Sequence, residues 1–514
     1  MKIYQVITAI LFACILLICI ISFRPGHEES TANQYPDKEY LVFPRQLSPS
    51  TPYDVDIALE QRLLKENKID EAHRLFDILS WQMFISLNWP LNSSGNPHPE
   101  ISDHGEPAWA KWKESYEVFR EDGSSPLSWD SVNLPKRFMG RLPKNAKVLF
   151  RMSKTTAFFH HKRHTEKANE IDQAFTSPIW DQSGNIVRYE IRLNKPDFDY
   201  IVSNDLYNLN GQAAFSQAGK KVEFPAASRN KMGVVEVKLA WKILEPGKDH
   251  AERYYSTDAY VLNEDGSFSI KKVGLVGMHI ASRTQSSPQW IWATFEHVDN
   301  LETNPLKEVD GRPIKPSFYD PACPTCPVNL IPDTNQKIIK NQIQRVLPIL
   351  PATQELNTEV RKLLADKGSF MQYYQLIGTQ WPTDPSSPPY TGSLSAPDAL
   401  PQAVVNKSGG KPFPAYLTNM IMETYFQGGT SIADSLTAYN LYLGNEPAYF
   451  QVQGAIRTPL TKNTMIFGTE SCMGCHYSSS IATSIDAKGN AVFGNPGTAG
   501  FEWLLQLKAH VKTK

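Results

Sequence analysis

The chain has 514 residues, a hydrophobic content of 41% and a formal net charge of −1 at pH 7. This composition excludes a disordered chain, and the balanced charge gives no electrostatic reason to expect nucleic acid as a partner. The length predicts two or three domains, or one large domain with appendages.

The N-terminal residues predict an exported protein. Residues 3–23 carry no formal charge and are rich in Ile, Leu and Val, and a run of this length can cross a bilayer. Because no A-x-A-like site precedes Arg24, we expect residues 1–26 to be a signal anchor, with a cleaved signal peptide as the alternative. Residues 27–52 have the composition of a polar tether. We therefore expect a periplasmic protein, attached to the inner membrane through this segment.

Residues 53–381 are predicted to form a large α+β domain. Its expected helices, from apolar side chains at helical spacing, lie at 56–67, 70–88, from Trp109 onward, 334–347 and 354–377. Its expected strands, from alternating apolar side chains and turn residues, lie near 147–152 and 188–202 and at 235–243, 259–262, 267–280 and 290–298. The predicted fold class is thus α+β, with an antiparallel β-rich central region flanked by helices.

The last part of the chain is expected to be separate from this domain. Residues 382–414 are rich in Pro, Ser and Gly and are predicted to form an arm. Residues 415–514 are predicted to form a mainly helical C-terminal segment, with helices at 417–427 and 501–510.

Two cysteines lie between prolines in the middle of the chain. Cys323 and Cys326 belong to the segment Pro-Ala-Cys-Pro-Thr-Cys-Pro. In an oxidising compartment a local disulfide is the default for such a pair. A thioredoxin-like redox pair is the alternative, but the flanking prolines do not match its strand-to-helix context. We therefore predict a structural disulfide.

The segment Cys472-Met473-Gly474-Cys475-His476 has the Cys-x-x-Cys-His spacing of a haem c attachment site. At such a site the two thiols bond to one porphyrin and the imidazole binds its iron. A disulfide or half of a zinc site is the alternative. We predict one covalent haem c, held by Cys472, Cys475 and His476, that performs one-electron transfer with a redox partner protein.

The sequence does not identify the sixth ligand of this iron. Only 38 residues follow His476 and none is Met, so the ligand comes from upstream, from His510, or from no residue. Met420, Met422 and Met465 are the nearby thioether candidates. Methionine ligation suits electron transfer, whereas an open iron suits binding or activation of a small oxidant.

His279 and His297 are the other candidates for chemistry, as iron ligands or as catalytic residues. If their strands pair, the two imidazoles could face each other across the sheet. They would then favour a haem peroxidase or oxidoreductase with an open iron, or a haem-based sensor. The alternative is that both histidines are structural.

Four segments resemble large bacterial "cytochrome c family" proteins with a single C-terminal haem site. They are 80–90, 278–280 together with 288–300, 422–425 and 471–476. The resemblance implies an exported monohaem protein and says little about its substrate. It implies a role only for Cys472, Cys475 and His476.

Overall fold

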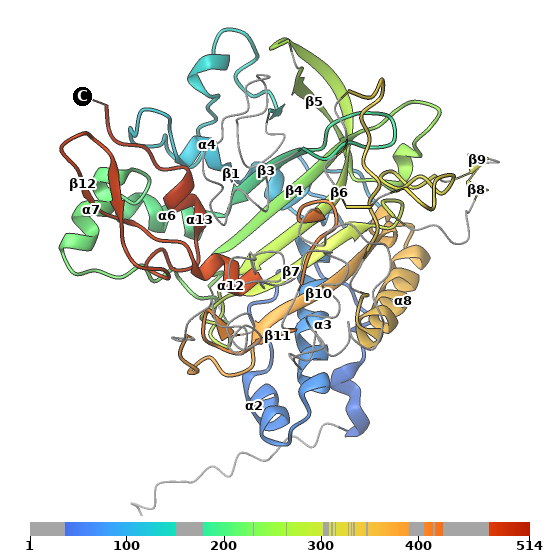
Figure 1. Cartoon of the computed structure of the whole chain (residues 1–514). Coiled ribbons are helices and arrows are strands. Elements are labelled where there is room, and N and C mark those ends of the chain that lie inside the picture. Colours follow the sequence, from blue (N-terminus) through green and yellow to red (C-terminus); the bar gives the residue numbers. More distant parts are fainter. Residues whose placement is uncertain are drawn as a thin grey trace, which may run out of the picture. The chain divides into compact units, whose positions relative to one another are not determined.

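In a computed structural model of the chain, most strands belong to one nine-stranded sheet (Figure 1). The structure describes residues 36–150, 178–301, 308–389, 406–424 and 472–513, apart from short gaps within these ranges. Phe43–Lys514 form one compact unit. The only element described before it is the 3-10 helix η1 (Pro36–Leu41).

The sheet runs in the order β1-β3-β4-β6-β7-β10-β11, with β5 paired to the first part of β6 and β2 paired to β5. Its strands are β1 (Lys113–Glu114), β2 (Val148–Leu149), β3 (Arg188–Leu193), β4 (Val235–Ile243), β5 (Ser256–Leu262), β6 (Phe268–Ser282), β7 (Ile291–His297), β10 (Tyr374–Pro382) and β11 (Pro412–Phe413). The β2–β5 pair is parallel and the other pairs are antiparallel. Two separate hairpins are β8 (Glu308–Val309) with β9 (Arg312–Pro313), and β12 (Ala482–Ile485) with β13 (Ala491–Phe493).

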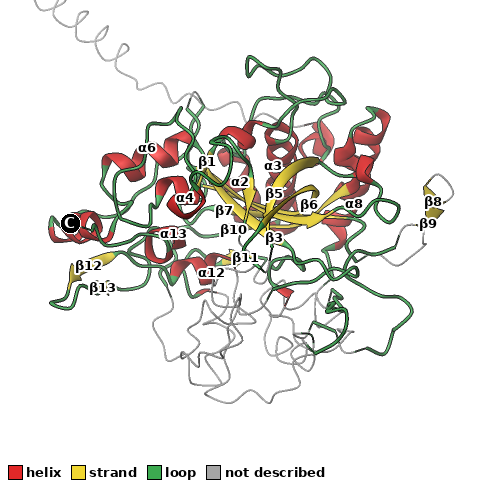
Figure 2. Ribbon diagram, turned by 90° about the horizontal axis from the view of Figure 1, so that it is seen from above, coloured by secondary structure: helices red, strands yellow, loops and turns green. Residues whose placement is uncertain are grey.

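The described helices surround this sheet. They are α2 (Ile57–Lys65), α3 (Ile69–Leu87), η2 (Ala108–Lys111), α4 (Ser115–Val118), η3 (Lys136–Phe138), α6 (Lys195–Ser203), α7 (Leu209–Gln217), η5 (Ala251–Arg253), α8 (Pro351–Asp366), η6 (Phe370–Tyr373), α12 (Cys472–Tyr477) and α13 (Trp503–Leu507). Figure 2 shows α2, α3 and α8 on one side of the sheet and α12 on the other.

The side covered by α3 and α8, here called the helical face, is the apolar core. Phe295 of β7 stacks on Phe84 of α3 with ring centroids 4.2 Å apart, and Trp81 meets the same ring edge-on at 5.0 Å. Such aromatic pairs add to the free energy gained by burying their area.

The opposite side, here called the motif face, carries polar side chains. Paired residues point to the same side of a sheet and neighbours along a strand alternate, so the register defines this face. Its members include Glu236, Lys238, His279, Trp292, Thr294 and Gln380. Burying polar groups costs free energy unless they are hydrogen-bonded, so this face needs specific partners.

The coarse fold prediction is confirmed, because an antiparallel sheet with flanking helices is observed. Helices α2 and α3 and strands β4 and β7 lie where the periodicity of apolar residues placed them. The described part of the C-terminal segment holds two short helices and the β12–β13 hairpin.

Several element predictions are wrong. No helix forms over the described residues of 334–347, whose backbone instead bonds to other loops, as Ile343 N does to Phe318 O at 2.9 Å. The helix predicted at 354–377 ends at Asp366, because Gly368 turns the chain with a φ of +67° and β10 begins at Tyr374. The strand predicted at 188–202 ends at Leu193, where the side chain of Asn194 caps α6.

The predicted helix at 417–427 is also wrong over its described residues. Residues 417–424 form a loop with a turn at 420–422, and their polar groups bond both to one another and to the motif face. The Asn419 side chain donates to Thr294 Oγ1 at 2.8 Å, and the Met420 N–H donates to Glu296 Oε1 at 2.7 Å.

The description of the chain as a transmembrane protein is corrected by the structure. Within the described residues, no helix is both long and apolar enough to cross a membrane. The predicted anchor at 1–26 lies outside those residues.

Candidate haem-binding site

Helix α12 places the three residues of the predicted haem motif. Cys472 and Cys475 are three residues apart, and His476 is four residues from Cys472, so all three lie on one side of the helix. All three are half-buried, and neither cysteine is in a disulfide. The Cys472 thiol donates to the carbonyl oxygen of Leu417 at 3.6 Å.

The imidazole of His476 has a defined orientation. Its Nδ1 lies 2.8 Å from the carbonyl oxygen of Phe501. A carbonyl oxygen only accepts, so Nδ1 carries the hydrogen and the lone pair of the neutral ring is on Nε2. A histidine that donates its other ring N–H to a backbone carbonyl is the usual arrangement of a metal-binding histidine.

Two tryptophans lie beside the motif. The Trp292 indole is 4.1 Å from the His476 ring, measured between centroids, and tilted by 46° to it. The Trp503 indole N–H donates to the carbonyl oxygen of Cys475 at 3.1 Å. Because Trp292 is in β7 and Trp503 is in α13, both elements hold α12 in place.

A glutamine connects α12 to the sheet. The side-chain oxygen of Gln380, in β10, accepts from the N–H of Met473 at 2.8 Å. Its amide nitrogen donates to the carbonyl oxygen of Pro414 at 2.7 Å. Gln380 is fully buried, and the two bonds therefore satisfy a polar group that would otherwise destabilise the core.

Two candidate methionine ligands belong to a core cluster that contains no residue of α12, and the third lies outside the described residues. Met420 and Met422 are buried in a core cluster with Val276 and Phe318. Met422 packs on β6, where a Cβ placed at Gly277 would lie 3.2 Å from its Cε. Met465 lies outside the described residues.

His297 has a structural environment. Its Nε2 donates to the carbonyl oxygen of Arg253 at 3.1 Å, and its Nδ1 accepts from the N–H of Asp299 at 3.1 Å. Its ring stacks on Tyr254 at 3.9 Å. Burial lowers the pKa of His297 to about 4, so the ring is neutral at pH 7.

The two candidate histidines do not face each other. His279 pairs with Thr294, and His297 is three positions further along β7, so their side chains lie on opposite faces of the sheet. His297 belongs to the helical face. Of the two histidines, only His279 lies on the motif face. Trp292, which contacts His476, lies on the same face.

His279 forms a charged cluster with two neighbours. Its Nε2 lies 3.0 Å from Oε1 of Glu423, and Lys238 Nζ lies 3.9 Å from the same oxygen. The second oxygen of Glu423 accepts from the N–H of Asn419 at 2.8 Å. Burial raises the pKa of Glu423, but the nearby His279 and Lys238 outweigh it and hold this pKa at about 2. Glu423 is therefore ionised at neutral pH.

Buried carboxyl groups lie beyond Phe501. Glu502 follows it, and its side chain accepts from the N–H of Leu504 at 2.5 Å to cap α13. Burial raises the pKa of Asp197 well above its usual range, and the charge of Glu502 adds to this effect. Burial also raises the pKa of Glu236, on the motif face. Asp197 and Glu236 therefore favour their neutral form.

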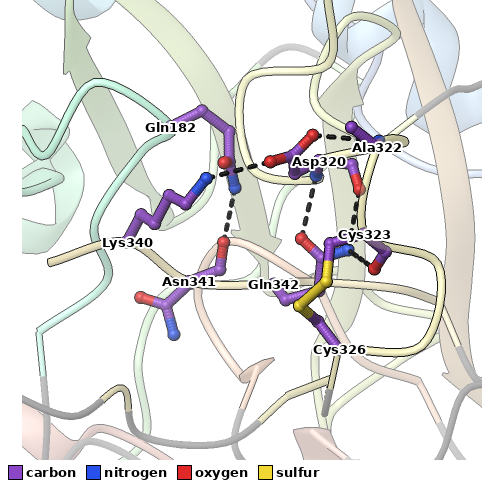
Figure 3. Close-up of a disulfide and its surroundings, with 8 residues drawn as sticks. All are labelled: Gln182, Asp320, Ala322, Cys323, Cys326, Lys340, Asn341 and Gln342. Atoms are coloured by element: carbon purple, nitrogen blue, oxygen red, sulfur yellow. Dashed lines mark hydrogen bonds and ion pairs between the residues drawn. A yellow bond between two sulfur atoms is a disulfide. The ribbon is translucent and has the colours of Figure 1, made fainter. Parts of the chain in front are cut away.

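Cys323 and Cys326 are joined in a disulfide (Figure 3). Their loop is tied to its surroundings by Gln342, whose amide nitrogen donates to the carbonyl oxygens of Asp320 at 3.0 Å and Cys323 at 3.1 Å. Lys340 adds an ion pair with Asp320 at 2.9 Å. These contacts fix the position of the loop.

The prediction that the chain binds a metal is wrong for a site made only of protein side chains. Among the described residues, no group of three or more His, Cys, Asp or Glu side chains is arranged to hold a metal ion. A haem iron is a different case, because the porphyrin supplies four ligands and the protein one or two.

Comparison with known proteins adds no relatives. No family model, curated protein or solved structure matches this chain. The descriptions of the chain as a cytochrome and as an electron-transfer protein therefore have no support from known proteins.

Sequence reasoning missed several residues around the motif. Trp292, Gln380, Phe501 and Glu423 were not expected to contact the candidate site. They are distant in sequence from the residues they touch, and no spacing rule connects them. The sequence signals that included Trp292 were the strand predicted at 290–298 and the family resemblance, and neither placed it beside the motif.

Proposed function

We propose that this chain is a haem c protein that transfers single electrons. The observation that carries the proposal is the hydrogen bond from His476 Nδ1 to the Phe501 carbonyl oxygen, at 2.8 Å. This bond directs the lone pair of the ring to Nε2 and fixes the ring beside two cysteines that are not in a disulfide.

The residues present fit a covalent haem. Cys472 and Cys475 would hold the porphyrin by two thioether bonds, and His476 would bind the iron through Nε2. The bound haem would supply an iron that takes up and releases one electron. Trp292 and Trp503 would keep water from the histidine side of the ring, since both are buried.

The disulfide between Cys323 and Cys326 supports an oxidising location for the protein. An oxidising compartment is also where a Cys-x-x-Cys-His segment is found with haem in exported proteins. We therefore propose that the protein acts outside the cytoplasm with a redox partner protein.

The test is haem staining on a denaturing gel after expression with a haem-attachment system. Wild-type chain should stain, and the double variant C472A/C475A should not. The matched control is C323S/C326S, which removes the other cysteine pair and should still stain. Staining that persists in C472A/C475A would disprove the attachment site.

A haem-dependent oxidoreductase is the second candidate function, favoured by the His279–Glu423 contact. His279 and Trp292 are diagonal neighbours on adjacent strands, so the imidazole lies near the motif on the same face. A histidine oriented by a carboxylate can accept and donate protons near neutral pH.

The spectrum of the purified protein separates the two functions. A low-spin ferric spectrum that peroxide leaves unchanged, with a reduced spectrum that carbon monoxide leaves unchanged, favours electron transfer. A high-spin spectrum that shifts with peroxide favours the oxidoreductase, and the shift should then be slower in His279→Gln. A shift of the reduced spectrum with carbon monoxide, and no shift of the ferric spectrum with peroxide, favours the haem-based sensor.

A further inference from the structure

A cavity of about 310 Å³ opens on the helical face, at the ends of β4 and β6. An extended segment at 51–53 forms one wall and the turn at 227–233 forms another. Residues of three kinds line it: the cationic Arg229 and Lys231, the hydroxyl-bearing Thr51, Ser228, Ser282 and Thr284, and a largely apolar group of Pro52, Tyr53, Met83, Ala227, Met232, Gly233 and Val235.

The charge of this cavity has one sign. Arg229 and Lys231 are exposed on the turn at its mouth, and no acidic residue is among the described residues that line it. Two acids adjoin lining residues in the sequence. Glu236 follows Val235 but lies on the motif face, and Asp54 follows Tyr53, where its carboxylate accepts from the N–H and the hydroxyl of Ser286 at 2.9 and 2.5 Å. The mouth therefore attracts anions.

The interior is apolar and has one hydroxyl without a strong partner. Met83, Met232 and Val235 supply thioether and aliphatic surface. Ser282 is only 3% exposed, and its hydroxyl donates to the Met83 sulfur at 3.7 Å. Sulfur is a weak acceptor, so this hydroxyl is available to a bound ligand. Met232 is 42% exposed at the rim, which is unusual for a large apolar side chain.

We propose that this cavity binds a small amphipathic organic anion, a carboxylate with an apolar body. Its carboxylate would lie between Arg229 and Lys231, and its apolar part would lie along the two methionines. A volume near 310 Å³ is at the lower end of small-molecule sites. An inorganic anion would leave the apolar interior empty, and a neutral molecule would leave the cationic mouth unused. The proposal does not depend on haem at Cys472 and Cys475.

The test is isothermal titration of the full chain with octanoate, octanol, octylammonium and inorganic phosphate. Octanoate should bind, and the other three should bind at least tenfold more weakly. The double variant R229A/K231A should lose at least tenfold in octanoate affinity. Met232→Glu should lose a similar factor, because it places a negative charge at the mouth. Both changes are at exposed positions, so folding should be retained.

The matched control is K271A/K272A, which removes two exposed cations at the other end of β6. Its octanoate affinity should equal that of the wild type. Three results would overturn the proposal: no octanoate binding at millimolar concentration, equal binding of octanol, or equal loss in R229A/K231A and K271A/K272A. Phosphate binding as tight as that of octanoate would overturn its apolar part.

Discussion

Trp292 of β7 and His476 of α12 lie in ring contact, with centroids 4.1 Å apart. The strand belongs to the centre of the sheet and the helix to the C-terminal segment. This contact, together with the bond from Met473 to Gln380, means that the position of the candidate haem ligand is set by the large α+β region.

Replacing Trp292 with Ala should destabilise the fold and loosen His476. The indole is buried, and removing a large buried aromatic side chain costs about 3–5 kcal/mol of unfolding free energy. Urea unfolding of the purified chain measures this loss. Trp292→Phe is the matched control, since it keeps an aromatic ring and should lose clearly less. Equal stability of Trp292→Ala and the wild type would contradict the described packing.

His297 should make the protein sensitive to acid. Its pKa is about 4 in the folded chain and about 6.5 when unfolded, so below pH 6.5 the unfolded chain binds the extra proton. The folded state should lose about 3 kcal/mol through this group as the pH falls from 6.5 to 4.

Stability curves of the wild type and His297→Gln measure this effect. As the pH falls from 6.5 to 4, the free energy of unfolding should fall more in the wild type than in the variant. The reason is that the unfolded variant has no imidazole at position 297 to take up the proton. His104→Gln, at an exposed histidine, is the control and should parallel the wild type. Parallel curves for His297→Gln would show that His297 is not held neutral.

Glu423 should change the stability of the fold at a lower pH than His297 does. It stabilises the fold in its charged form, whereas His297 does so in its neutral form. Its pKa is about 2 in the folded chain and about 4.5 in the unfolded chain, so its ionised form stabilises the fold. That stabilisation is fully present above pH 4.5 and is lost as the pH falls toward 2. The ionised Glu423 carboxylate contributes about 3 kcal/mol to the free energy of unfolding in this way.

Glu423→Gln should therefore be less stable than the wild type at pH 6, and the gap should narrow toward pH 3. Denaturant titrations at several pH values measure the gap. Glu355→Gln, at an exposed carboxylate of α8, is the control and should show a small gap at every pH. A gap that is constant with pH would mean that the His279–Glu423 contact carries no charge.

The disulfide should contribute modestly to stability. Because Cys323 and Cys326 close a loop of only three residues' separation, its effect on the unfolded chain is about 2 kcal/mol. C323S/C326S should lower the midpoint of thermal unfolding, and a thiol reductant should lower that of the wild type alone. If the reductant lowered the unfolding midpoint of C323S/C326S by the same amount, its effect would come from other cysteines and not from this disulfide.

The sequence predicted the parts of the fold where local pattern and burial agree. Strand β4 alternates apolar and polar residues and was predicted with its observed bounds. The first four residues of β10, 374–377, were predicted as the end of a helix, because this short stretch continues the pattern of α8 and is too short to show a strand period. The helix predicted at 334–347 failed because its polar groups bond to distant loops, which no local pattern shows.

The candidate site also has parts that the sequence predicts and parts that it does not. The spacing of Cys472, Cys475 and His476 can be recognised in any sequence, because one short helical turn carries all three. The Phe501 carbonyl oxygen cannot be predicted, because every residue has one and only the fold selects it. The contact of His279 with Glu423 joins residues 144 positions apart and has no sequence signal either.

The mass of the purified, denatured chain tests the central proposal most directly. After expression with a haem-attachment system, we expect a mass increase of one haem, carried by the peptide that contains Cys472, Cys475 and His476. Both cysteines should resist alkylation in that peptide. An unmodified mass, with Cys472 and Cys475 both open to alkylation, would rule out covalent haem at these cysteines.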